Sequence, residues 1–118
     1  MRGAYGNEMG NGNKVKDYEG TLDMLVVALC RDYERRRRIL QDPKTAFRTA
    51  AELRYINFKI HDATVEIVGE EDAELYIKEI GERIGYAYSA VSDVCERTYK
   101  TRKRAVMTNI AKRLHLSD

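Results

Sequence analysis

Three carboxylates near the middle of the chain are the first residues whose spacing could do chemistry. Glu70, Glu71 and Glu74 fall within five residues of one another. Carboxylate oxygens are the ligands that Mg²⁺ takes when it holds a phosphate group. Carboxylates also stabilise the first turn of a helix, because its free N–H groups carry partial positive charge. An acidic helix start therefore explains the cluster without a metal ion.

The EExxE pattern of Glu70, Glu71 and Glu74 is similar to the first half of the metal site in all-α nucleotide pyrophosphohydrolases of the MazG type. The resemblance implies a second half, an ExxD motif on a later helix, and none occurs downstream. His61 and His115 stand alone, and the chain has no nucleophile motif and no Gly-rich phosphate loop. We therefore expect a protein that is not an enzyme and takes no cofactor and no metal.

The charged residues are distributed unevenly along the chain. Residues 1–69 carry 12 basic and 10 acidic side chains, residues 70–96 carry 2 and 8, and residues 97–118 carry 7 and 1. The C-terminal segment is thus a basic stretch behind an acidic one. Arg35 to Arg38 spread around a helix rather than along one side, which favours a solvated helix end. The alternatives are phosphate contact, or pairing with residues 70–74 of a neighbouring subunit.

Residues 77–96 have the spacing that a helix-turn-helix requires. Ile80 and Ile84 form the apolar pair of a first helix, with Gly81 as the small residue between them. Gly85 falls where the turn needs a residue that tolerates positive φ. Val91 and Val94 would anchor a second helix.

The pattern IxxIGxRIGYxxSxV resembles the helix-turn-helix superfamily of DNA-binding regulators and, more narrowly, small phage-type transcriptional regulators. The resemblance implies a recognition helix starting near Ala87 in the major groove of double-stranded DNA. It assigns base and phosphate contacts to eight residues: Tyr88, Ser89, Ser92, Arg97, Lys100, Arg102, Lys103 and Arg104. The expected function is that of a DNA-binding regulator.

One unbroken helix from about residue 73 to 114 is the alternative for the same segment. A single packing seam would then be formed by seven residues at three- and four-residue steps: Ile77, Ile80, Ile84, Ala87, Val91, Val94 and Thr98. Against this alternative, Gly81 and Gly85 inside the helix would each cost about 1 kcal/mol relative to alanine. The helix-turn-helix interpretation has its own difficulty, because it would place the carboxylates of Asp93 and Glu96 against the negatively charged DNA. The alternative function is a non-catalytic helical-bundle module for dimerisation or for binding a protein partner.

The remaining elements are helices separated by clear boundaries. Residues 1–16 are rich in Gly and Asn, which predicts a flexible tail before a single helical domain over 17–118. Apolar spacing predicts helices from about 17 or 21 to 41 and from 43 to 68. Asp42-Pro43 and Gly69 mark their ends. The fold class is therefore all-α, a three- to four-helix bundle with long helices.

The bulk composition fits this interpretation. The 118 residues contain one proline, and no apolar run approaches the length of a membrane span. Cys30 and Cys95 lie far apart and without metal-ligand spacing, which indicates two reduced thiols. We expect a cytoplasmic protein that does not enter membranes. Because the apolar seams are long for a small bundle, we also expect a homo-oligomer, most simply a dimer.

Overall fold

The computed structural model describes the backbone of residues 9–116 and the side chains of residues 20–116. Within that range every regular element is helical, which confirms the all-α fold class. The elements are α1 (Met9–Arg31), α2 (Tyr33–Leu40), α3 (Phe47–Val68), α4 (Glu70–Gly81), the short 3-10 helix η1 (Tyr86–Tyr88) and α5 (Glu96–Arg113). Because Asp32 alone separates α1 from α2, these two count as one broken segment in a four-helix domain.

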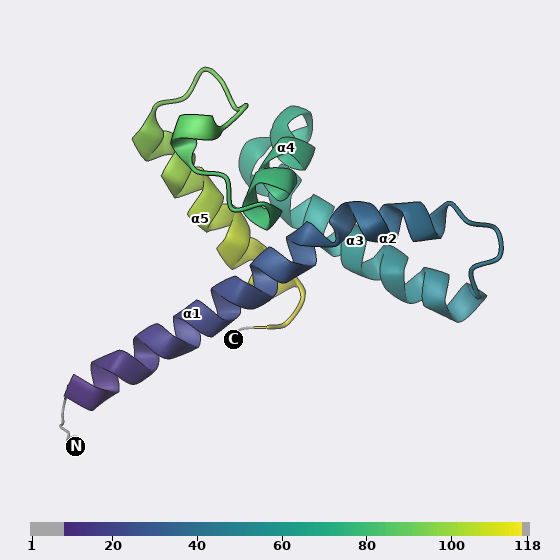
Figure 1. Ribbon diagram of the computed structural model, residues 1–118, viewed down its shortest axis with the longest axis horizontal. Coiled ribbons are helices and arrows are strands. Elements are labelled where there is room, and N and C mark those ends of the chain that lie inside the picture. Colours follow the sequence, from purple (N-terminus) through teal and green to yellow (C-terminus); the bar gives the residue numbers. More distant parts are fainter. Residues whose placement is uncertain (1–8, 117–118) are drawn as a thin grey trace.

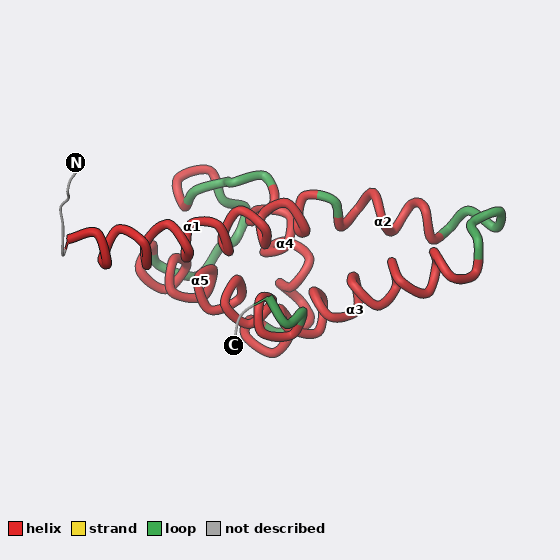
Figure 2. The backbone as a smooth tube through the Cα atoms, turned by 90° about the horizontal axis from the view of Figure 1, so that it is seen from below, coloured by secondary structure: helices red, strands yellow, loops and turns green. Residues whose placement is uncertain are grey.

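The helices form a packed body with two projections, the N-terminal part of α1 and the α2–α3 pair (Figures 1 and 2). The C-terminal part of α1, the second half of α3, α4 and α5 pack together, whereas α2 and the first half of α3 extend away as an antiparallel pair. The Cα radius of gyration is 17.0 Å, against about 13 Å for a compact domain of this length. Within residues 33–59 the buried side chains are those of Tyr33, Arg36 and Asn57, so the α2–α3 pair is exposed on most of its circumference.

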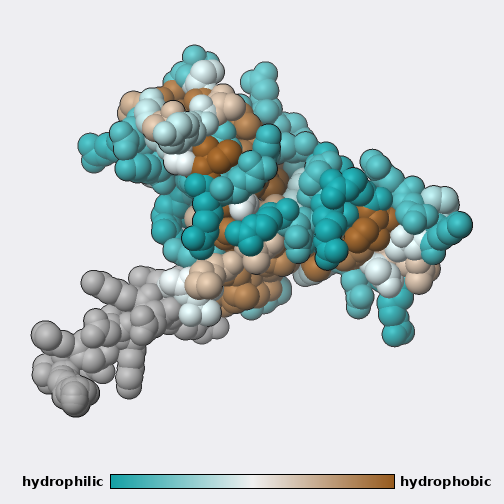
Figure 3. Space-filling view, in the orientation of Figure 1, coloured by the Kyte–Doolittle hydropathy of each residue, from teal (hydrophilic) through white to brown (hydrophobic). Residues whose placement is uncertain are grey.

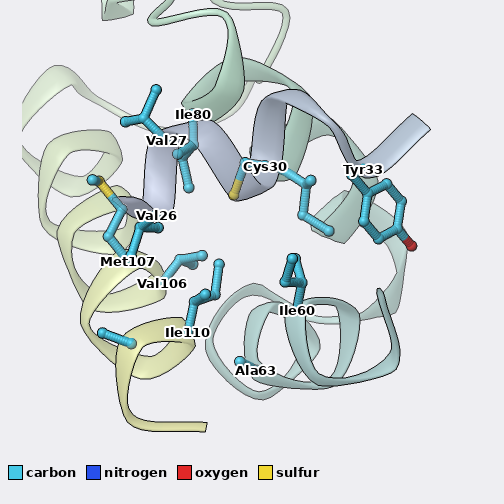
Figure 4. Packing of buried hydrophobic residues seen from close by; sticks show 12 residues of the cluster. Val26, Val27, Cys30, Tyr33, Ile60, Ala63, Ile80, Val106, Met107 and Ile110 are labelled. Atoms are coloured by element: carbon cyan, nitrogen blue, oxygen red, sulfur yellow. The ribbon is translucent and has the colours of Figure 1, made fainter. Parts of the chain in front are cut away.

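The larger of two buried apolar clusters in the described residues joins α1, α3, α4 and α5. Val26 and Cys30 of α1 meet Ile60 of α3 and Val106 and Ile110 of α5, and all five side chains are buried (Figure 4). The sequence predicts the buried side of α3 from three- and four-residue steps between Leu53, Ile56, Ile60, Ala63 and Ile67. The prediction is correct at Ile60 and Ala63. At the end of the helix, however, Thr64 is buried and Ile67 is 36% exposed.

The two helix boundaries predicted near residues 42 and 69 are present, with one shift. Gly69 has a φ of 90° and ends α3, as expected. The predicted helix start at Pro43 is wrong, because α3 begins at Phe47. Asp42 accepts a hydrogen bond from the Lys44 backbone at 2.9 Å, and the Thr45 hydroxyl donates to the Ile39 carbonyl at 2.8 Å. These local bonds form a turn before the helix begins.

The segment after Gly69 forms neither a helix-turn-helix nor one long helix. The recognition helix expected near Ala87 is absent, because η1 and extended chain occupy that region and α5 begins only at Glu96. The unbroken helix is equally wrong, since α4 ends at Gly81. Gly85 is extended, with a φ of −88° and a ψ of 173°. The positive φ values in this segment belong to Arg83 and Asp93.

The buried carboxylate of Glu79 explains why residues 82–95 leave the helical path. It is 2% exposed and accepts hydrogen bonds from the Ser89 hydroxyl at 2.6 Å, the Ala90 N–H at 2.7 Å and the Tyr99 hydroxyl at 2.7 Å. A buried carboxylate is tolerated only when such donors surround it. Burial and the neighbouring Glu79 raise the pKa of Tyr99 to about 12. The chain from 82 to 95 therefore folds around one side chain of α4.

Gly81 lies where α4 crosses α1. A Cβ added at Gly81 would lie 2.6 Å from the Arg31 backbone nitrogen and 2.8 Å from the Cys30 carbonyl carbon. The Arg31 side chain also donates to the Gly81 carbonyl at 3.3 Å. The glycine is thus required for close approach of two helices, whereas a Cβ at Gly85 would meet nothing within 4 Å.

The N-terminal part of α1 begins earlier than the sequence predicts. Residues 9–16 of the segment expected as a flexible tail are helical, and residues 1–8 lie outside the described range.

Candidate functional site

The residues predicted to read DNA bases do not share a helix. Tyr88 ends η1 and is 87% exposed, whereas Ser89 and Ser92 lie on the irregular chain that follows. The Ser89 hydroxyl donates to Glu79 and accepts from the Val91 N–H at 2.9 Å. Its polar group is therefore used within the fold.

The basic residues of α5 are largely engaged by other parts of the chain. The Lys103 ammonium donates to the Ile84 carbonyl at 2.6 Å and lies 5.5 Å from the centre of the Tyr99 ring, and burial lowers its pKa. Lys100 pairs with Glu96 at 2.7 Å, and Arg104 pairs with Asp23 of α1 at 2.8 Å. Arg97 is exposed and Arg102 half-buried. Of the three exposed members of this set, Arg97, Lys100 and Arg104, two are therefore paired with carboxylates of the same chain.

Positive charge is also concentrated on the α2–α3 pair. We call residues 33–59, which comprise α2, the connecting turn and α3 as far as Lys59, the arm. The arm carries eight basic and three acidic side chains, a net charge of +5, while the other residues carry 13 and 16. Four of the basic side chains are exposed and form no ion pair within the described part of the chain: Arg38, Lys44, Arg48 and Arg54.

The arginine run on α2 spreads around the helix, as the sequence predicts. Arg36 points inward, donating to Asn57 at 2.6 Å and to the Leu29 carbonyl, just before the helix break. Arg37 binds Glu74 of α4 and lies over the Tyr33 ring at 5.1 Å, and its contact with Glu74 raises its pKa. Pairing of this run with residues 70–74, an alternative expected from the sequence for a neighbouring subunit, occurs here within one chain, between Arg37 and Glu74.

The acidic cluster of α4 is also partnered within the chain. Glu70 lies 3.3 Å from His61, and Glu74 binds Arg37. In the described part of the chain no group of three or more His, Cys, Asp or Glu side chains is placed to hold a metal ion. The cluster therefore opens α4 and joins it to α2 and α3.

Aromatic side chains form a stripe along the outer side of the arm. Phe47 is 87% exposed, Phe58 61% and Tyr55 49%. Because each helical residue turns by about 100°, these three and Ala51 fall within an arc of about 80°. That arc lies opposite the buried Ile60 side of α3. Figure 3 shows apolar side chains interleaved with hydrophilic ones where the arm projects.

Basic side chains flank this aromatic stripe on both edges. The same helical arithmetic places Arg54 on one edge and Arg48 and Lys59 on the other. The Lys59 ammonium lies 5.4 Å from the centre of the Tyr55 ring, a cation–π distance. Asp62 continues the stripe toward the body, but it is bound by Arg113. The outer side of α3 is thus aromatic along its middle and positive along its edges.

The two thiols lie in contrasting environments away from the arm. Cys30 is buried in the core, and burial raises its pKa to about 12. Cys95 is exposed before the first turn of α5, and hydrogen bonds from Thr98, whose hydroxyl lies 3.3 Å from the sulfur, lower its pKa. Both cysteines are free thiols, and among the described residues neither belongs to a group of His, Cys, Asp or Glu side chains that could hold a metal ion.

Comparison with known proteins identifies no relative of this chain. No protein-family model, curated protein or solved structure matches this chain. Among the described helices, none combines the length and apolar character needed to cross a bilayer. The fold and the surface define the class only as a small all-α domain with a positively charged projecting arm.

Sequence reasoning missed this surface for two reasons. Summing charge over residues 1–69 hid the arm's +5 among acidic neighbours. The sequence also assigns no surface to Phe47, Tyr55 and Phe58, although they lie off the Leu53, Ile56 and Ile60 spacing that marks the buried side. That offset between two stripes on one helix was the available signal.

Proposed function

We propose that this chain is a non-catalytic nucleic-acid-binding protein whose contact surface is the arm. The observation that carries the proposal is the set of four exposed basic side chains, unpaired within the described chain, beside exposed aromatic rings. Lys and Arg that replace the counterions of a polyanion supply most of the affinity in such complexes. The proposal keeps the general class expected from the sequence, but it moves the contact from the 77–96 segment and the basic residues 97–104 to the arm.

The arm suits a polyanion better than a second copy of itself. Two arms brought face to face would each present a net charge of +5, and such like charges repel across an interface. Outside the arm and the basic residues 97–118, the chain carries six basic and 15 acidic side chains, a net charge of −9, so a polyanion would be repelled by that part of the chain.

Salt dependence of binding tests the proposal. With about four or five phosphates contacted, affinity for a fluorescein-labelled oligonucleotide should fall on the order of 10²-fold between about 50 and 200 mM salt. Fluorescence anisotropy measures that slope. No binding at about 50 mM salt, or binding that salt leaves unchanged, would contradict the proposal.

Self-association is a second candidate, favoured by a different surface. Met24 is 63% and Leu25 46% exposed on α1. A groove between α1 and α5 is lined by the apolar side chains of Leu22, Val26 and Met107 and by the polar side chains of Asp23, Arg104 and Thr108. A dimer formed there would leave both arms open to nucleic acid. Light scattering at several concentrations distinguishes a monomer from such a dimer.

A further inference from the structure

We infer that the arm binds single-stranded rather than duplex nucleic acid, with unpaired bases stacking on Phe47, Tyr55 and Phe58. The inference rests on the proposed function and specifies its ligand. Exposed rings of this kind are costly in water, and 87% exposure of Phe47 leaves nearly the whole ring available. Unpaired bases offer flat faces that stack on aromatic side chains whatever the sequence.

A duplex cannot use these rings in the same way. Its bases are stacked on each other, so a protein meets phosphates on the outside and only base edges in the grooves. The three aromatic side chains project from the outer side of a helix, and each is at least 49% exposed. Contact with a duplex would leave the rings against phosphates or solvent, whereas a single strand can turn its bases toward them.

The dimensions of the stripe fit a short stretch of strand. Phe47 and Tyr55 are eight residues apart and Phe58 follows three residues later. At about 1.5 Å per residue the stripe spans about 16 Å. That length accommodates on the order of four nucleotides, the lower end of site sizes in single-strand-binding domains.

The charges on the edges of the stripe supply the phosphate contacts. Arg54 lies on one edge and Arg48 and Lys59 on the other, so a strand whose bases cover the rings keeps its backbone beside guanidinium or ammonium groups. Lys59 already lies over the Tyr55 ring at 5.4 Å. A base stacked on the exposed side of that ring would sit next to a cation, which strengthens the stack.

Binding of two matched ligands to two matched variants tests the inference. The ligands are an oligothymidylate of about 15 nucleotides and a DNA duplex of about 15 base pairs. The variant F47L/Y55L/F58L keeps the arm's charge and removes the rings. The control Y88L removes a ring that is as exposed as Phe47 but lies outside the arm. All four positions are at least 49% exposed, so helicity by circular dichroism should stay unchanged.

The wild-type chain should bind the single strand at least about 10-fold more tightly than the duplex. The triple variant should lose at least about 10-fold for the single strand and almost nothing for the duplex, while Y88L binds like wild type. Equal affinity for the two ligands, unchanged by the triple substitution, would overturn the inference and leave the proposed function standing. If the chain binds neither DNA, both the inference and the proposed function are overturned. The same holds if it binds phosphatidylserine vesicles but neither DNA.

Discussion

Replacing Gly81 with alanine is expected to destabilise the domain by about 2–3 kcal/mol, in spite of the better helix propensity of alanine. The added Cβ would lie 2.6 Å from the Arg31 nitrogen and 2.7 Å from the Arg31 Cα. Both are backbone atoms of α1, so no flexible side chain can move aside. The two helices would have to separate, which loosens the packing of Cys30, Ile77 and Ile80 in the core.

Gly85→Ala is the matched control for that variant. Gly85 has a negative φ and open space around its Cα, so alanine there should be neutral or should stabilise by less than about 1 kcal/mol. Thermal unfolding followed by circular dichroism should show a melting temperature for Gly81→Ala roughly 8–12 °C below wild type. Equal melting temperatures for the two variants would show that α1 and α4 do not make this close contact.

Removing charge from the arm is expected to have the largest effect on binding. The variant R38A/R48A/R54A loses three exposed cations that have no ion pair in the described chain. Affinity for an oligonucleotide at about 50 mM salt should fall at least about 10-fold, and the salt slope should decrease by about 2–3. Fold stability should hardly change, because exposed positions contribute little to it.

The matched control removes three cations outside the arm. K78A/R97A/K112A takes away equal charge from exposed positions on α4 and α5, one of them in the segment that the sequence assigned to DNA contact. This variant should retain affinity within about 3-fold of wild type, since only long-range attraction is lost. A greater loss in the control than in the arm variant would place the binding surface on α5 rather than on the arm.

The parts of the fold that depend on local pattern were predictable from the sequence. The apolar spacing identified the helices around Val26, Ile60 and Ile80, and Gly69 marked a true helix end. Residues 82–95 were not predictable in this way. Their path depends on Glu79 bonding to Ser89, Ala90 and Tyr99, contacts that span 10 to 20 residues and leave no periodic trace.

The candidate surface could not be identified from the sequence for the same reason, because it also depends on contacts between distant residues. In the sequence the basic run of α5 looks like a set of unpaired charges. In the structure, however, Arg104 binds Asp23, 81 residues away, and Lys103 binds the Ile84 carbonyl. The arginines of α2 give no sign of which one is buried until Asn57 is placed beside Arg36. Whether a charge is free or engaged is decided by tertiary contacts, and only the exposed set remains for a partner.

Chemical-shift mapping on the ¹⁵N-labelled chain tests the central claim most directly, because it reports where the nucleic acid lies as well as whether it binds. On titration with oligothymidylate, amides of α3 around Phe47, Tyr55 and Phe58 should shift, together with those of Arg38 and Lys44. Amides of α5 from Arg97 to Arg104 should hardly move. Shifts concentrated on α5, with the arm unchanged, would contradict the account.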